Sequence, residues 1–342
     1  MGRIRTASLV IAATLTLVLG AGIGPGAGPA GASNDPSFGA QWGMARIGAE
    51  TAWTRTTGTG IRIGIVDTGV DLNHEDLAGK VVAHASCVGA NGDPAGCKES
   101  AQDDQGHGTH VSGIAAAIKD NAKGVSGAAP GAELVVAKVL SSTGSGTAED
   151  VTAGIKWVVD QGARVVNLSL GDPAMVITST LGGDNDLRAG VDYAWSHGAV
   201  PVVAAGNSNA LGLGLEGSAY GDLNAIVVGA TGPDDTVAGY SSSTGQAKWA
   251  LVAPGGAGDG DPAHDILSTI WIQGKPNSYD ELAGTSMAAP HVSGAVALLL
   301  AQGHTPQTAV ERLLNTADKN VSCGSSSPTC RGRLDVAAAT GP

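Results

Sequence analysis

Five short apolar segments that lack polar alternation constrain the fold of this chain most strongly. The segments are residues 61–66, 134–139, 165–168, 200–204 and 225–228. A strand with one face in water alternates apolar and polar residues, whereas a parallel strand covered by helices on both faces has a continuous apolar run. Stretches with helical character, among them 148–160 and 186–197, separate the segments. We therefore expect an α/β fold with a mostly parallel central sheet that helices cover on both faces.

Local signals agree with helices between these strands. Thr147 stands before the stretch 148–160 and Asp150 follows three residues later, which predicts a capping box. The chain has 53 glycines but one phenylalanine among its 342 residues. This composition predicts that the elements pack closely through small side chains.

The first 32 residues have the pattern of a secretory signal peptide. Arg3 and Arg5 precede an apolar run over 7–19, and Ala30-Gly31-Ala32 supplies small residues for cleavage. The run is too short to span a bilayer, and no later run is long enough. We therefore expect a secreted, extracellular protein without a membrane anchor. Residues 33–317 are expected to form one domain, and residues 318–342 a C-terminal tail on the surface.

The charge of the chain argues against two classes of partner. It has 31 acidic and 19 basic side chains, which give a formal net charge of −12. Loss of Arg3 and Arg5 with the signal peptide lowers this charge by two. A chain this acidic is poorly suited to bind nucleic acid or anionic lipid through charge.

The four cysteines form two close pairs, Cys87 with Cys97 and Cys323 with Cys330. Three connectivities are open to four cysteines. The two local disulfides are favoured because each closes a short loop in an oxidising compartment, while free thiols remain the alternative. Neither pair has the two-residue spacing of a zinc site.

Three motifs supply the groups of a serine nucleophile. They are Val66-Asp67-Thr68-Gly69, His107-Gly108-Thr109-His110 and Gly284-Thr285-Ser286-Met287-Ala288-Ala289-Pro290. A serine hydroxyl is a weak nucleophile, so it needs a base within about 2.6–3.2 Å and a third group that fixes the tautomer of the base. Asp67, His107 and Ser286 fit these roles, and this chemistry needs no catalytic cofactor.

These motifs and their flanking residues resemble the subtilase family of serine peptidases, thermitase-like members most closely. The order Asp, His, Ser along the chain is that of subtilisin. The resemblance runs from about residue 34 to about residue 301. Its further landmarks are Asn34-Asp35-Pro36, Ser169-Leu170-Gly171, Ala204-Ala205-Gly206-Asn207 and Ala253-Pro254-Gly255.

The resemblance implies a subtilisin-like fold and an acyl-enzyme mechanism. The backbone N–H of Ser286 and the side-chain amide of Asn207 are the implied oxyanion donors. Ser286 is also expected to open a helix, whose positive end favours a developing oxyanion. Two further histidines, His110 and His291, are expected to pack in the core.

Substrate binding is also implied by the resemblance. Subtilases bind an extended peptide as an added strand between two backbone segments. The matching segments are Gly144, Ser145 and Gly146 on one side and Ser169, Leu170 and Gly171 on the other. The specificity pocket should lie between the second segment and Ala204, Ala205 and Gly206. Its walls are small or apolar, so we expect a broad preference for apolar or aromatic side chains. The chain departs from the family at Gly217-Ser218-Ala219, where Tyr-Pro-Ala is common.

A structural calcium site is a further implication of the resemblance. The matching ligands are the side chains of Asp35, Asp76 and Asn121 and the carbonyl oxygens of Ile118, Lys123 and Val125. Carboxylate, amide and backbone oxygens are the ligands that calcium prefers. The alternative is that these are solvated acids beside an ordinary turn.

The expected function is therefore that of a secreted, monomeric serine endopeptidase with broad specificity for protein or peptide substrates. Two alternatives are an inactive subtilase-fold binding protein and a dedicated processing peptidase. The presence of Asp67, His107, Ser286 and Asn207 together favours an active enzyme. The expected lack of an anchor favours a degradative enzyme over a processing one.

Overall fold

The structure is a computed structural model that describes residues 33–98, 100–170, 177–178, 183–207 and 221–342. In these residues, eight strands form one sheet in which every neighbouring pair is parallel. Its order is β12 (Cys330–Arg333), β9 (Trp249–Pro254), β8 (Ile226–Thr231), β7 (Val200–Ala204), β5 (Val165–Leu168), β1 (Arg62–Asp67), β3 (Glu133–Lys138) and β2 (Val81–Ser86). All five predicted strands are present, so the expected parallel sheet is confirmed.

The topology of the sheet changes direction at β1. This strand pairs with β3 on one side, where Asp67 lies opposite Lys138, and with β5 on the other, where Ile63 lies opposite Val165. In open α/β sheets, ligands bind outside the carboxyl ends of the strands at such a switch point. The carboxyl ends of β1 and β5 are therefore where a functional site is expected.

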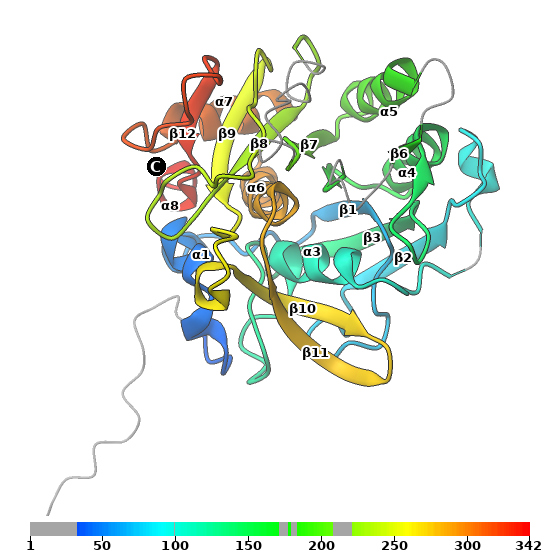
Figure 1. The fold of residues 1–342 in the computed structure, drawn as a ribbon, viewed down its shortest axis with the longest axis horizontal. Helices are drawn as coiled ribbons and strands as arrows, with labels where there is room; N and C mark the ends of the chain where they lie inside the picture. The colour runs from blue at the N-terminus through cyan, green and yellow to red at the C-terminus, as the bar shows by residue number, and fades with distance from the viewer. Residues whose placement is uncertain (1–32, 99, 171–176, 179–182, 208–220) are drawn as a thin grey trace, which may run out of the picture.

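Helices cover both faces of the sheet, as expected (Figure 1). One face packs against α3 (His107–Ala116) and α6 (Thr285–Ala301), and the other against α4 (Ala148–Asp160) and α5 (Gly183–Ser196). Consecutive strand residues point to opposite faces, so Ile65 and Val66 enter two different buried clusters. No helix in the described ranges has both the length and the apolar character required to cross a membrane.

Smaller elements surround this core. An antiparallel hairpin of β10 (Ile266–Ile272) and β11 (Lys275–Leu282) extends beyond α3, as Figure 1 shows. The smaller elements are η1 (Phe38–Ala40), α1 (Trp42–Arg46), α2 (Ala49–Trp53), η2 (Pro94–Gly96), β4 (Gly146–Thr147), β6 (Ile177–Thr178), η5 (Pro262–His264), β10 (Ile266–Ile272), β11 (Lys275–Leu282), α7 (Pro306–Thr316) and α8 (Val336–Ala339).

The C-terminal segment differs from the expected surface tail. Its strand β12 pairs with β9 and forms one edge of the central sheet. Leu334 and Val336 after it are buried in the main core. Both favoured disulfides are present, Cys87–Cys97 and Cys323–Cys330. The segment is therefore integrated into the fold, and the boundary at residue 317 stays a prediction.

The predicted capping box of α4 is half formed. The hydroxyl of Thr147 accepts the N–H of Asp150 at 3.1 Å, as expected. The carboxylate of Asp150 instead accepts the N–H groups of Gly89 and Asn91, each at 2.9 Å. Asp150 therefore joins the first turn of α4 to the loop that the Cys87–Cys97 disulfide closes.

Candidate active site

The end of β1 and the start of α3 bring Asp67 and His107 into contact. Their Oδ1 and Nδ1 atoms lie 2.8 Å apart. The Asp67 side chain is fully buried, and that of His107 is 11% exposed. Because an ionised carboxylate can only accept, we assign the proton to Nδ1, which leaves Nε2 of His107 as a base.

A second set of hydrogen bonds fastens α3 to the turn after β1. The Thr68 hydroxyl accepts the N–H of Gly108 at 2.9 Å and donates to Asp103 Oδ1 at 2.9 Å. A Cβ atom on residue 108 would lie 2.2 Å from the carbonyl oxygen of Gly69, so only glycine permits this approach. The neighbours of Asp67 and His107 are thus held together independently of the contact between those two side chains.

Asp103 is a site residue that sequence reasoning missed. Its carboxylate accepts N–H groups of Gln105, Gly106 and Thr109 and the hydroxyl of Thr109. Burial raises the pKa of Asp103, but these hydrogen bonds outweigh burial and the pKa is lowered overall. An aspartate four residues before the start of α3 could have been read as a cap for that helix.

Lys138 is a second missed residue. Its ammonium donates to the carbonyl oxygens of Thr68 and Leu140 and to Asp104 Oδ1, each at 2.7 Å. All three of its N–H donors thus have acceptors. Lys138 thereby links the turn after Asp67 to Leu140, which lies four residues before the predicted substrate segment at Gly144.

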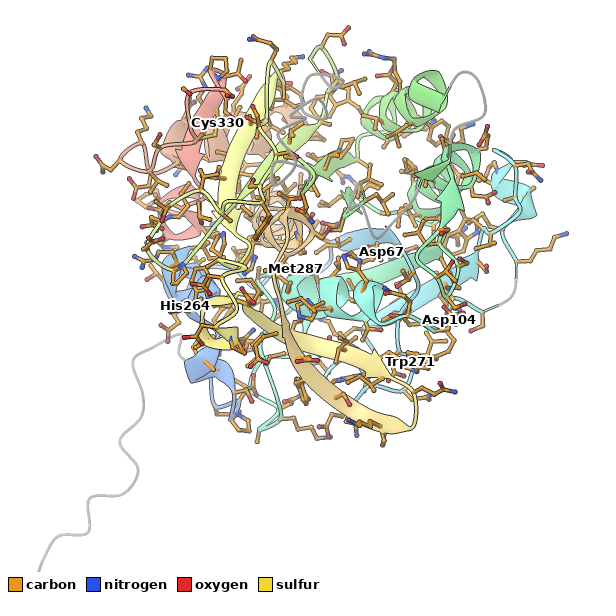
Figure 2. All side chains as sticks on the ribbon, in the orientation of Figure 1. Asp67, Asp104, His264, Trp271, Met287 and Cys330 are labelled. Atoms are coloured by element: carbon orange, nitrogen blue, oxygen red, sulfur yellow. A yellow bond between two sulfur atoms is a disulfide. The ribbon has the colours of Figure 1, made fainter. Side chains whose placement is uncertain are left out.

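The first turn of α6 places Ser286 and orients Asn207. Figure 2 labels Asp67 at the end of β1 and Met287, which follows Ser286 in α6. Ser286 is 2% exposed, and its hydroxyl donates to the carbonyl oxygen of Ser169 at 3.3 Å. The Oδ1 atom of Asn207 accepts the N–H and the hydroxyl of Thr285 at 3.0 and 2.9 Å. Since Oδ1 is held there, the Nδ2 group of Asn207 faces away from Thr285 and can serve as a donor.

The sheet brings together most of the predicted substrate-binding residues. Because β5 and β7 are neighbours, Ser169 and Leu170 lie at the same edge as Ala204, Ala205 and Gly206. All five are buried and uncharged. Gly144 and Ser145 lie in a turn in which the N–H of Ser141 bonds to the carbonyl of Ser145, and Gly146 begins β4. Gly171 and Gly217-Ser218-Ala219 lie outside the described residues.

The proposed calcium ligands gather around one loop. Asp76 is fully buried, and its two oxygens accept Asn121 Nδ2 at 2.7 Å and the N–H of Val125 at 2.8 Å. The carbonyl of Asp76 accepts the N–H of Ile118, and Asn121 Oδ1 accepts that of Lys123. Asp76 therefore joins the turn before β2 to the loop at residues 118–125.

Asp35 fits a metal less well than Asp76 does. Its Oδ1 atom accepts the N–H groups of Asn121 and Ala122, and its Oδ2 atom accepts Ser33, Asp120 and Ser126 donors. These five hydrogen bonds fill the capacity of a carboxylate, whereas Asp76 keeps some capacity for a cation. Within the described residues, no group of three or more His, Cys, Asp or Glu side chains is placed to hold a metal ion. A calcium site at Asp76 therefore stays a prediction, and Asp35 supports the loop by accepting its N–H groups.

The expectation that His110 and His291 pack in the core is confirmed. Both side chains are buried, and each bonds to a backbone carbonyl. Burial lowers the pKa of His110 to about 3 and that of His291 to about 4. Both are therefore neutral at physiological pH.

Comparisons with known proteins show which family the chain resembles. The chain matches the profile described as the subtilase family over residues 58–331. Thermitase from Thermoactinomyces vulgaris is 39% identical over 287 residues, which cover 84% of this chain and 91% of the relative. Subtilisin DY from Bacillus licheniformis is 38% identical over 249 residues, 72% of this chain and 78% of the relative. A solved structure among the proteases from Pseudoalteromonas arctica PAMC 21717 has a TM-score of 0.73 and 28% identity, and the match covers 90% of this chain and 98% of that one.

Proposed function

Because this chain belongs to the subtilase family and is a serine endopeptidase, we propose that Asp67, His107 and Ser286 are its catalytic triad. The observation that carries this proposal is the 2.8 Å contact between His107 Nδ1 and buried Asp67. The start of α6 supplies Ser286, and substrates are proteins or peptides. This assignment uses each of the three sequence motifs in one reaction.

The proposed reaction begins with proton transfer. His107 Nε2 takes the proton of Ser286 while the serine oxygen attacks the carbonyl carbon of the scissile peptide. The resulting oxyanion accepts hydrogen bonds from the Ser286 N–H and Asn207 Nδ2. Collapse of this intermediate breaks the C–N bond, and His107 returns the proton to the leaving amine. Water then attacks the acyl-enzyme by the same route and releases the second product.

The burial of Asp67 strengthens its effect on His107. Its Oδ2 atom has no hydrogen-bond partner among the described residues. The carboxylate charge is therefore poorly screened, and it favours the imidazolium that forms when His107 accepts the proton.

The proposal also covers specificity and location. The small, uncharged residues at the ends of β5 and β7 support a preference for apolar or aromatic side chains. We propose that residues 1–32 direct secretion and that the mature enzyme is a degradative monomer. A strand-like substrate would lie between the 144–146 segment and the segment that begins at Ser169.

Covalent labelling tests the nucleophile. The purified chain is incubated with a fluorophosphonate, digested, and mapped by mass spectrometry. We expect one labelled residue, Ser286, and parallel loss of activity against a denatured protein. A label on any other serine would contradict the triad assignment.

Asn207→Leu is expected to lower kcat by about 10²–10³ with little change in KM. The magnitude is that of the equivalent asparagine in subtilisin. The amide donates to an oxygen that becomes negatively charged only after attack, so its loss affects the transition state more than the bound substrate. Steady-state kinetics on a peptide substrate measure both constants. A loss confined to KM would indicate substrate positioning instead.

Calcium is expected to stabilise the fold through Asp76. A cation at hundredfold excess over its Kd adds about 2.7 kcal/mol to the free energy of unfolding, and for a domain of this size the Tm should rise by about 5 °C. The melting temperature is measured with calcium and with chelator in the Ser286→Ala background, which prevents autolysis.

Two variants separate the roles of the carboxylates. Asp76→Ala should abolish the response of the Tm to calcium. Asp35→Asn should lower the Tm in both conditions yet keep that response, because Asp35 accepts loop N–H groups. An unchanged response in Asp76→Ala would show that the site is misplaced.

A further inference from the structure

Pro290 interrupts the hydrogen bonding of α6 at one defined carbonyl. Each N–H in an α-helix bonds to the carbonyl four residues earlier, and proline has no N–H. Pro290 lies inside α6, so the carbonyl that loses its helical partner belongs to Ser286. The backbone carbonyl of Ser286, the proposed nucleophile, therefore lacks the usual N–H donor four residues later in the helix.

A side chain from outside the helix donates a hydrogen bond to this carbonyl instead. The hydroxyl of Ser169, directly after β5, donates to the Ser286 carbonyl at 2.8 Å. The carbonyl of Ser169 in turn accepts the hydroxyl of Ser286 at 3.3 Å. One residue thus contacts both the backbone and the side chain of the nucleophile.

The direction of the Ser169 hydroxyl is set by a buried chain of hydrogen bonds. Asn167 Nδ2 donates to Ser169 Oγ at 2.9 Å, and Asn167 Oδ1 accepts the hydroxyl of Ser293 at 2.8 Å. Asn167, Ser169 and Ser293 are all fully buried. Since Ser169 Oγ already accepts from Asn167, its own proton is directed to the carbonyl of Ser286.

We propose that Ser169 is a positioning residue that holds Ser286 in register with the bound substrate. The inference rests on the proposed role of Ser286 as nucleophile. Ser169 also begins the segment proposed to pair with the substrate backbone. Ser169 therefore connects the attacking oxygen to the segment beside which the scissile carbonyl would lie. Because a misplacement of the reacting atoms by about 1 Å can slow a reaction about a hundredfold, this connection should affect the rate of acylation.

A double-mutant cycle tests the inference. Ser169→Ala removes the donor and should lower the single-turnover acylation rate by about tenfold or more, with KM nearly unchanged. Pro290→Ala restores an N–H to the helix, so the Ser286 carbonyl regains an internal partner. In that background, Ser169→Ala should cost less than about threefold, because the restored N–H of residue 290 also donates to the Ser286 carbonyl.

Ser293→Ala is the matched control. It breaks the outer bond of the chain but keeps the bond from Ser169 to Ser286, so acylation should stay within about threefold of wild type. If Ser169→Ala does not fold, Ser169→Cys replaces it, because a thiol is a weak hydrogen-bond donor. Acylation slower by about tenfold in Ser169→Cys would support the inference, and acylation within about threefold of wild type would contradict it.

Other outcomes would overturn the inference. Equal losses for Ser169→Ala in the wild type and in the Pro290→Ala background would mean that the hydroxyl does not act through the freed carbonyl. A change in KM alone would assign Ser169 to substrate binding. Fluorophosphonate labelling of the wild type keeps the two proposals apart, because label on Ser286 without coupling in the cycle rejects only the role of Ser169.

Discussion

Ser286→Ala is expected to lower kcat by about 10⁶ and to leave the fold intact. The magnitude comes from subtilisin, a member of the same family. The substitution removes the proposed attacking oxygen. Among the described residues, the hydroxyl makes one 3.3 Å hydrogen bond, to Ser169, so little stability is lost. His107→Ala should have a similar effect, because without a base the serine keeps its proton.

The combination of these substitutions is the stricter test. Residues that act as one unit are not additive, so Ser286→Ala/His107→Ala should be no slower than either single variant. Activity that remains reflects the oxyanion donors and substrate binding. The measurement is kcat on a peptide substrate, with circular dichroism to confirm folding. A double variant far slower than both singles would show that the two residues act separately.

Asp67→Asn is expected to lower kcat by about 10⁴, the second largest effect. The N–H of Thr68 donates to Asp67 Oδ1 at 2.7 Å, so the asparagine should keep its oxygen at that place. Its NH₂ group then takes the position of Oδ2, which has no partner among the described residues. His107 keeps its contact but loses the negative charge that stabilises its protonated form.

Pre-steady-state kinetics can locate this loss. The acylation step should slow by nearly the full factor while the affinity for substrate is retained. Asp104→Asn is a suitable control, since Asp104 is a nearby carboxylate that binds Lys138. If Asp67→Asn lost only a fewfold, or Asp104→Asn lost as much, the role of Asp67 would be contradicted.

The buried strands were predictable because they have continuous apolar runs, but the sheet edges were not. In β2 exposed and buried positions mix, and β12 reads Cys-Arg-Gly-Arg. Their pairing depends on the edges of β3 and β9 rather than on their own sequences. The hairpin of β10 and β11 was missed for a related reason, since much of β11 is exposed and charged. Such elements are set by tertiary contacts more than by local pattern.

The same limit applies to the site. The motifs around Asp67 and His107 predicted which groups would react, and the structure brings those two side chains together. The groups that hold them come from far away in the chain: Asp103 reaches Thr68 across 35 residues, and Ser169 reaches Ser286 across 117. Pro290 is part of the motif around Ser286, but its effect on the Ser286 carbonyl depends on a partner, Ser169, that no local pattern reveals.

The wholly parallel central sheet affects how the enzyme folds. Each parallel pair needs a crossover, and the pair of Ile63 with Val165 joins residues about a hundred positions apart. Formation of contacts between such distant residues costs chain entropy before the contacts stabilise the fold, so folding is intrinsically slow. For an endopeptidase, slow folding has a direct cost, because molecules that are still unfolded can be cleaved by molecules that have already folded. The yield of refolded enzyme should therefore fall as its concentration rises, and a reversible inhibitor of the mature enzyme should restore it.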